Sequence, residues 1–401
     1  MSTTSGLSTP HLRDANITFT EEGHQYSIHG SSEHYISVTT FVHEWFEPFD
    51  AKKSITKMML GRRWKTSKYY GKSSEEIEKE WEDKRNDAST KGTLLHKCIE
   101  DFYNETPPPL SYVRPVEFNY FLEFHESRVV PSLKPYRTEW MVYDEESQIA
   151  GSIDMVYEDA SGYYHIYDWK RTAELVEDNM HQKGKFPLQD LPDTNYWRYC
   201  VQLNLYKYIL EKHYGKKVKT MYLVCFHPTR SSYHHREVCD LQPLIRLLIT
   251  KRKCQLSSTI RLYFEKDSTV VEYPILFVSY SCLLQLFYES HVYLGEGMKC
   301  DVQWEKKCME DILEFYVYYH SYADASSILL SDEKDLYSLF PEWCRAFVHS
   351  RSEEWLMEML LMCDFFQMPI LQNVLSASVA RRIVKDIDER STQERGSSLS
   401  A

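Results

Sequence analysis

The sequence predicts an α/β protein of two domains. The chain has 401 residues, of which 43% are hydrophobic, and this length favours two domains or more over one. Residues 152–169 show the alternation and the central turn residues of a strand pair, whereas residues 194–213 and 241–254 have the apolar spacing of helices. Strand patterns and helix patterns therefore alternate along the chain.

Composition and targeting signals exclude several other classes of protein. No stretch approaches the apolar length of a membrane span, and the opening residues MSTTSGLSTPHLRD lack both the apolar core of a signal peptide and the arginines of a transit peptide. We therefore expect a protein of the cytosol or nucleus with no membrane partner. The ten cysteines include no C-x-x-C pair, so neither a zinc ribbon nor a disulfide framework is predicted.

The first hundred residues predict a strand pair followed by helices. Residues 16–28 alternate around a turn at 21–23, and residues 37–50 begin with Ser/Thr and have helical spacing up to a proline. Residues 75–86 are charged and helical in composition. A second helix is predicted over 87–103, stopped by the prolines that follow.

The middle of the chain predicts a helix and then three strands. Residues 115–130 carry phenylalanines at helical spacing, which we interpret as core rather than as a surface for base stacking. A strand-like run over 138–143 contains Glu139. The hairpin of residues 152–157 and 163–169 follows it.

This hairpin places charged groups close together. Asp168 and Lys170 are two residues apart and so share one face of a strand, and a hairpin of this length can bring Asp154 beside Asp168. Two carboxylates a few ångströms apart repel each other unless a cation lies between them. Considered alone, an Asp-x-Lys tripeptide on a strand is also explained by an exposed ion pair.

A loop, a long helix and a hairpin are predicted next. Residues 172–192 contain glycine and proline breakers. In the helix over 194–213, Gln202 and Tyr206 lie one turn apart on one face. Strands over 219–226 and 233–239 form the hairpin.

After a polar interval at 255–268, the pattern changes. A strand over 270–278 and helices over 281–289, 304–322 and 353–383 predict a smaller, mostly helical α/β domain.

Four ordered motifs resemble those of a known superfamily. Glu139, then Gly151-x-x-Asp154, then Asp168-Trp169-Lys170 resemble the core of the PD-(D/E)xK nucleases, and most of all the RecB-like exonucleases. Residues 16–50 resemble the N-terminal segment of the RecB-like nucleases of large DNA viruses of eukaryotes. The run Gly92-Thr93-x-x-His96-x-x-x-Glu100 and the pair Gln202-x-x-x-Tyr206 match further elements of these enzymes. The resemblance implies a restriction-endonuclease-like mixed sheet flanked by helices over residues 1–255.

The resemblance also implies a site and its chemistry. His96, Asp154, Asp168 and the carbonyl of Trp169 would hold one or two Mg²⁺ or Mn²⁺ ions. Lys170 would orient or deprotonate a water, and Glu139 would join the metal site or position Lys170. Supporting or DNA-contacting roles are implied for Glu100, Gln202 and Tyr206. His96 by itself is also explained by a structural role. No iron–sulfur cluster is expected, because the cysteines are not clustered.

The activity that the resemblance implies is DNA cleavage from ends in the RecB-like manner, hence that of an Mg²⁺-dependent exonuclease. A net charge of −12 does not favour a DNA partner, since phosphate affinity comes largely from lysine and arginine. The basic run from Lys52 to Lys68 could line a DNA channel or be a solvated helix face.

The C-terminal region resembles a different family. Residues 343–383 are similar to the second half of the small BTB/POZ-type adaptors of cullin ubiquitin ligases, which implies an interaction domain over 266–388 and a cullin or another protein as partner. An unrelated helical bundle explains the same spacing. A disordered tail is predicted over 389–401. The alternative function is a catalytically weak nuclease-fold scaffold. The positions expected to pack are Leu356, Leu360, Cys363, Phe366, Ile370, Leu371, Val374 and Val379.

Overall fold

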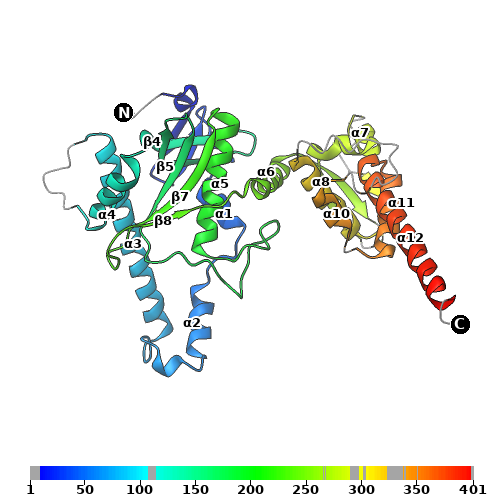
Figure 1. Ribbon diagram of the computed structural model, residues 1–401, viewed down its shortest axis with the longest axis horizontal. Coiled ribbons are helices and arrows are strands. Elements are labelled where there is room, and N and C mark those ends of the chain that lie inside the picture. The colour runs from blue at the N-terminus through cyan, green and yellow to red at the C-terminus, as the bar shows by residue number, and fades with distance from the viewer. Residues whose placement is uncertain are drawn as a thin grey trace. The chain divides into compact units, whose positions relative to one another are not determined.

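The computed structural model describes residues 10–106, 114–264, 266, 268–289, 298–300, 304–322, 337, 340–349 and 351–398. The chain forms two compact units, Met1–Ile245 and Arg246–Ala401, and we describe each by itself (Figure 1). The division falls inside a helix, α6 (Gln242–Leu256), whereas the sequence predicts a boundary after it. The described residues include no helix long and apolar enough to cross a membrane.

The first unit is built on a six-stranded sheet with the order β3-β5-β6-β7-β8, in which β4 also pairs with β5. The sheet is mixed, since β6 and β7 run parallel and β5 and β6 antiparallel. This confirms the predicted mixed α/β fold. The strands are β3 (Ile36–Ser37), β4 (Leu133–Asp144), β5 (Ile149–Asp159), β6 (Tyr164–Lys170), β7 (Val218–Cys225) and β8 (His234–Glu237).

The predicted hairpins are present. Asp159 closes the β5–β6 turn, because its Oδ1 accepts hydrogen bonds from the backbone N–H groups of Ser161 and Tyr163. Gly162 in that turn has a φ of 77°, a conformation that costs glycine little. A separate two-stranded sheet joins β1 (Ile17–Thr20) and β2 (Gln25–Ile28).

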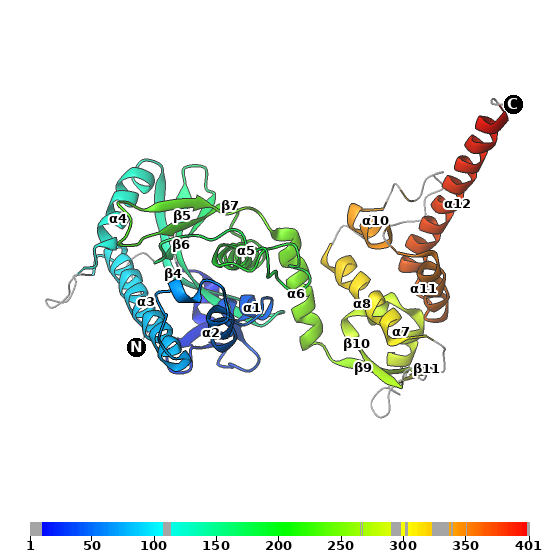
Figure 2. The same ribbon diagram turned by 90° about the horizontal axis from the view of Figure 1, so that it is seen from below.

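Helices lie on both faces of this sheet (Figures 1 and 2). One face carries α1 (Val38–Glu44) and α5 (Asn195–His213). The other carries α3 (Ser74–Tyr103) and α4 (Glu117–Phe124). The predicted core role of the aromatics in α4 is confirmed, because Phe118, Phe121 and Phe124 are buried in one apolar cluster with Trp169.

The two helices predicted over 75–86 and 87–103 are one helix, α3. Ser73 begins it with a capping box, in which its side chain accepts from the N–H of Glu76 and the Glu76 carboxylate accepts from the N–H of Ser73. The sequence prediction was wrong about the break, because no proline interrupts residues 74–103 and propagation adds a hydrogen bond for each further residue.

A helical arm extends from the first unit. We define it as residues 50–86, comprising α2 (Ala51–Met59), a 3₁₀ turn (Trp64–Thr66) and the first part of α3. Figure 1 shows α2 beside the N-terminal part of α3, projecting away from the sheet. Ile55, Tyr69 and Ile77 form a small apolar cluster in the arm, and Trp81 Nε1 donates to the Tyr69 hydroxyl over 2.8 Å. These contacts fix α2 against α3.

The second unit contains a three-stranded sheet with the order β10-β9-β11, followed by helices. The predicted polar interval at 255–268 contains a strand, β9, because Ile260, Leu262 and Phe264 alternate toward the core. The strand predicted over 270–278 ends at Pro274 and continues as a 3₁₀ helix (Ile275–Tyr280). The elements are β9 (Thr259–Phe264), β10 (Thr269–Pro274), α7 (Cys282–Glu289), β11 (Met298–Cys300), α8 (Lys306–Ser321), α10 (Glu342–His349), α11 (Glu353–Phe365) and α12 (Pro369–Ser398).

The packing positions predicted for α11 and α12 are mostly internal. Of the eight, five are buried and three are half-buried. The disordered tail predicted from residue 389 differs from the structure, in which α12 continues to Ser398. No proline follows Pro369, so nothing in the sequence stops the helix. The five buried positions are Leu356, Cys363, Phe366, Leu371 and Val374.

Candidate active site

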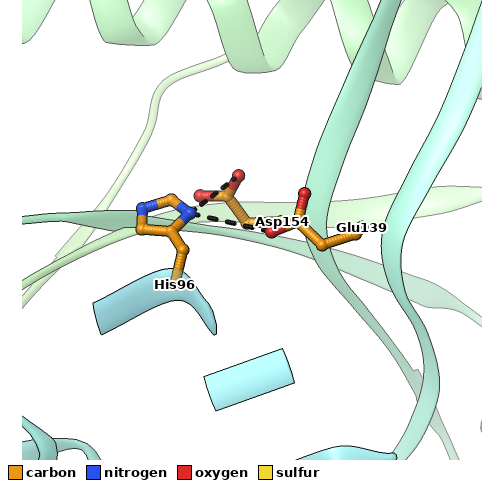
Figure 3. Close-up of side chains that lie close together, drawn as sticks. All are labelled: His96, Glu139 and Asp154. Atoms are coloured by element: carbon orange, nitrogen blue, oxygen red, sulfur yellow. Dashed lines mark ion pairs between the residues drawn. The ribbon is translucent and has the colours of Figure 1, made fainter. Parts of the chain in front are cut away.

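Three segments that are distant in sequence bring one imidazole and two carboxylates together. Figure 3 shows His96 of α3, Glu139 of β4 and Asp154 of β5 directed toward one another. His96 Nδ1 lies 3.7 Å from Glu139 Oε1 and 3.7 Å from Asp154 Oδ1. One ligand atom from each residue lies within 4.8 Å of the others. Within the described ranges, no other group of three such side chains meets this condition.

Strand register explains why the two carboxylates meet. In the antiparallel pairing of β4 and β5, Thr138 lies opposite Met155 and Trp140 lies opposite Ile153, so Glu139 and Asp154 fall between these pairs. Glu139 has a φ of 45° within its strand, a left-handed conformation that costs a non-glycine residue about 1–3 kcal/mol. Such strain concentrates at functional sites. Ser152 Oγ holds this carboxylate by donating to Glu139 Oε2 over 3.1 Å.

The backbone of Trp169 connects the imidazole to Asp154. Its N–H donates to Asp154 Oδ2 over 2.7 Å, and its carbonyl oxygen lies 2.9 Å from His96 Nε2. Because a carbonyl only accepts, Nε2 must carry the proton of that hydrogen bond. In the neutral imidazole, the lone pair of Nδ1 then faces the two carboxylates, which is the arrangement of a metal-ligating histidine. The carbonyl of Trp169, predicted as a ligand, is therefore at the site as the partner of His96.

Asp168 and Lys170 lie at the end of β6. Lys170 Nζ is 2.5 Å from Asp168 Oδ2 and 4.7 Å from the centre of the Tyr199 ring. Asp168 is buried, and the Lys170 ammonium is the partner that the structure shows for its Oδ2. Asp168 stands outside the group of three, but its charge acts on the same site. A buried carboxylate oxygen held by one ammonium group has lone pairs left for a cation.

Helix α5 supports this end of the sheet. Gln202 Nε2 donates to Asp168 Oδ1 over 3.4 Å. Tyr206 is buried and packs against Gly151, where an added Cβ would lie 2.9 Å from the tyrosine hydroxyl. Both side chains therefore lie beside residues of the site, and their supporting roles stay predictions. The Glu100 carboxylate pairs with Lys97 at 3.0 Å on the same helix, and its role also stays a prediction.

Sequence reasoning missed two residues at the site, Ser152 and Tyr199. Each lies beside a predicted site residue at a spacing that shares a face: Ser152 is two positions before Asp154 on a strand, and Tyr199 is three before Gln202 on a helix. This periodicity could have found them.

The electrostatics show an excess of negative charge in a buried space. Burial raises the pKa of Asp154, and it raises the pKa of Asp168 to about 6. Burial alone would lower the pKa of His96, but the carboxylates of Asp154 and Glu139 outweigh it and raise that pKa to about 9. In the same way, Asp168 and Asp154 outweigh the effect of burial on Lys170 and raise its pKa.

A divalent cation fits this donor set. Carboxylate oxygens and one imidazole nitrogen suit Mg²⁺ or Mn²⁺. Burial raises the pKa of Asp154 and of Asp168, so a cation beside these groups would stabilise their charged forms. His96, Asp154 and Glu139 would hold the ion. Asp168 Oδ2 is the further carboxylate oxygen available beside them.

Fold and site together define an α/β protein in which an imidazole and carboxylates that could hold a cation meet at neighbouring strands, with Asp168 and Lys170 at the end of β6. Residues 62–246 match the family model of the PD-(D/E)XK nuclease superfamily. The chain therefore contains a PD-(D/E)XK nuclease superfamily domain, and members of this superfamily are phosphodiesterases that generally use divalent metals. The match ends one residue past the end of the first unit.

No curated protein matches the chain. Among solved structures, one entitled "Crystal structure of SSO0001" is similar over 57% of this chain and 79% of that chain, with 13% identity and a TM-score of 0.24. No conclusion on fold or function rests on a likeness of that size.

Metal binding by His96 should depend on pH. Because its pKa is about 9 without metal, a bound cation must displace a proton from the imidazole at neutral pH. The apparent metal affinity should therefore fall by about tenfold for each pH unit below 9. His96→Ala should weaken Mg²⁺ binding, flatten this pH dependence and be partly rescued by higher Mn²⁺. Isothermal titration calorimetry in buffers of different ionisation enthalpy measures both the affinity and the proton release.

The matched control is His181→Ala, which removes an exposed loop histidine. It should leave affinity and proton release unchanged. If His96→Ala binds Mg²⁺ as tightly as the wild-type protein, with the same pH dependence, then His96 is a structural residue.

Proposed function

We propose that this protein is a divalent-metal-dependent DNA nuclease that hydrolyses phosphodiester bonds from DNA ends. One observation carries the proposal: His96, Glu139, Asp154, Asp168 and Lys170 converge at one place in a PD-(D/E)XK domain. Exposed ion pairs do not explain carboxylates that are buried close together and repel each other, one of them on a strained backbone.

His96, Asp154 and Glu139 would hold the Mg²⁺ or Mn²⁺ ion, which would supply a water of lowered pKa and neutralise charge on the scissile phosphate. The N–H of Trp169 and the hydroxyl of Ser152 hold the carboxylates of Asp154 and Glu139 in place for this role. The raised pKa of Lys170 keeps its ammonium protonated at neutral pH. Lys170 therefore serves better as a donor to the charge that develops on the phosphate than as a base.

The order of the motifs supports action from DNA ends. The types of donor atom support Mg²⁺ as the natural ion. A direct test uses one linear duplex labelled at a 5′ end, the same duplex closed into a covalent circle, and a nicked circle, each with Mg²⁺, Mn²⁺ or a chelator. An exonuclease shortens the linear form progressively, spares the closed circle and is inactive with the chelator. Cleavage of the closed circle would show an endonuclease instead.

For residues 246–401 we propose a protein-interaction role, which is separate from the nuclease activity. The buried apolar positions of α11 and α12 support a folded interaction unit. The family match does not reach this region, so the adaptor resemblance, a cullin partner and the scaffold alternative stay predictions. The predicted domain limits and the cytosolic or nuclear location also stay predictions.

A further inference from the structure

The helical arm concentrates positive charge in an acidic protein. Residues 51–74 contain eight lysines and arginines and no aspartate or glutamate, although the whole chain has a net charge of −12. Selection for solubility alone does not require charges of one sign to gather in one segment. The eight are Lys52, Lys53, Lys57, Arg62, Arg63, Lys65, Lys68 and Lys72.

Most of these charges are available to a ligand. The first seven are exposed, and the structure shows no ion pair for them with any described carboxylate. Asp50 caps α2. The other acidic residues of the arm lie on α3, where part of their charge is already held: Glu80 pairs with Lys72 at 2.5 Å and with Lys84. The positive potential therefore gathers on α2 and on the turn between α2 and α3.

The arm also exposes apolar side chains between its basic residues. Leu60 is 83% exposed and Tyr70 is 57% exposed, and the rings of Trp64 and Tyr70 meet edge to face at 5.8 Å. A shallow groove of 560 Å³ on α2 is lined by Lys53, Thr56, Lys57 and Leu60. Basic groups mixed with exposed aromatics are typical of surfaces that follow a nucleic-acid backbone.

One helix joins the arm to the candidate active site. Helix α3 begins at Ser74 in the arm and carries His96 farther along. At a rise of 1.5 Å per residue, the axial distance between these residues is about 33 Å. This corresponds to about ten nucleotides at 3.4 Å per nucleotide of one strand. The apolar contacts between α2 and the start of α3 hold the basic residues of α2 at this end of the helix.

We propose that the arm binds the phosphate backbone of the DNA substrate about ten nucleotides from the scissile phosphate. This inference rests on the proposed nuclease function and adds a second contact on the substrate. The arm would hold DNA that extends beyond the active site, while short DNA would reach the site without touching the arm. An acidic protein partner is the competing occupant of this surface.

The test compares substrate lengths. In an Asp168→Asn background, which prevents cutting, we would prepare Lys53→Gln/Lys57→Gln and Arg63→Gln/Lys65→Gln. Fluorescence anisotropy would measure the Kd for duplexes and for single strands of 8 and 30 nucleotides at several salt concentrations. Each pair should weaken binding of the 30-nucleotide DNA by about tenfold or more and reduce the salt slope by about 1.8 for duplex DNA. The 8-nucleotide DNA should bind all proteins equally.

The matched control is Lys134→Gln/Lys217→Gln in the same background. Both lysines are exposed and lie near the β5–β6 turn, at the opposite end of β6 from Lys170. This control should bind 30-nucleotide DNA like the parent. The proposal is overturned if the arm variants bind 30-nucleotide DNA as tightly as the parent does. It is also overturned if they lose the same affinity for 8- and 30-nucleotide DNA, or if the arm binds an acidic protein and no DNA.

Failure of the inference and failure of the proposed function are separable. With Asp168 intact, arm variants that cut both lengths like the wild-type protein overturn the arm proposal and leave the nuclease intact. A wild-type protein that neither cuts nor binds DNA of any length overturns both. Circular dichroism melts check that the variants fold, as expected for exposed positions.

Discussion

Asp168→Asn is expected to abolish DNA cleavage, lowering the single-turnover rate by about 10³-fold or more, while the protein stays folded. Asp168 Oδ2 is buried and held only by the ammonium of Lys170, so the amide removes a negative charge that the site uses to balance Lys170 and the cation. The shape and the contact with Gln202 can persist. Asp154→Asn should have the same effect, because it removes a carboxylate that faces His96.

The control for this experiment is Glu158→Gln on the same hairpin. Glu158 lies near the β5–β6 turn, where its Oε1 accepts from the Tyr164 hydroxyl over 3.3 Å. This change should leave cleavage within about twofold of wild type, as is usual for a surface substitution away from the chemistry. Thermal melts of all three variants separate lost chemistry from lost folding. Cleavage by Asp168→Asn and Asp154→Asn at the wild-type rate would show that the proposed site is wrong.

Lys170→Ala is expected to lower cleavage by a similar factor for a different reason. The raised pKa of Lys170 keeps it charged, so its loss removes a donor to the charge that develops on the phosphate. Metal binding should persist or become tighter, because a cation beside the site has been removed. Calorimetry with Mg²⁺ and single-turnover cleavage, measured on the same protein, separate the two effects.

Lys207→Ala is a suitable control, since Lys207 makes an ion pair of 2.7 Å with Asp240 away from the site. It should change neither quantity. If Lys170→Ala lost Mg²⁺ binding together with cleavage, Lys170 would be needed to organise the metal ligands, and a role confined to the phosphate would be excluded.

Local pattern predicted much of the first unit. The β5–β6 hairpin could be predicted because Asp159 and Gly162 supply the turn and alternating residues flank it. The phenylalanines of α4 could be predicted as core residues because helical spacing places them on one face. Prediction failed where local signals were weak. The strand β9 was missed because polar residues surround it in the sequence. The single helix α3 was predicted as two helices because its first part is highly charged.

In the candidate site, too, local pattern predicted some residues and not others. Asp154, Asp168 and Lys170 follow from strand periodicity and one hairpin, so sequence reasoning could place them together. Glu100 matched a motif, but the structure pairs its carboxylate with Lys97 on the same helix. Motif spacing specifies a helix face and cannot specify which partner a long side chain will choose.

The sequence alone determined which residue types carry the chemistry and on which strands and helices most of them lie, because periods of 2 and 3.6 residues are local properties of the chain. Only the tertiary structure decided that the Trp169 backbone joins His96 to Asp154, that Glu139 adopts a left-handed conformation within its strand, and that a basic arm shares a helix with the site. Those features depend on contacts between segments up to about 70 residues apart, which close only when the whole core packs.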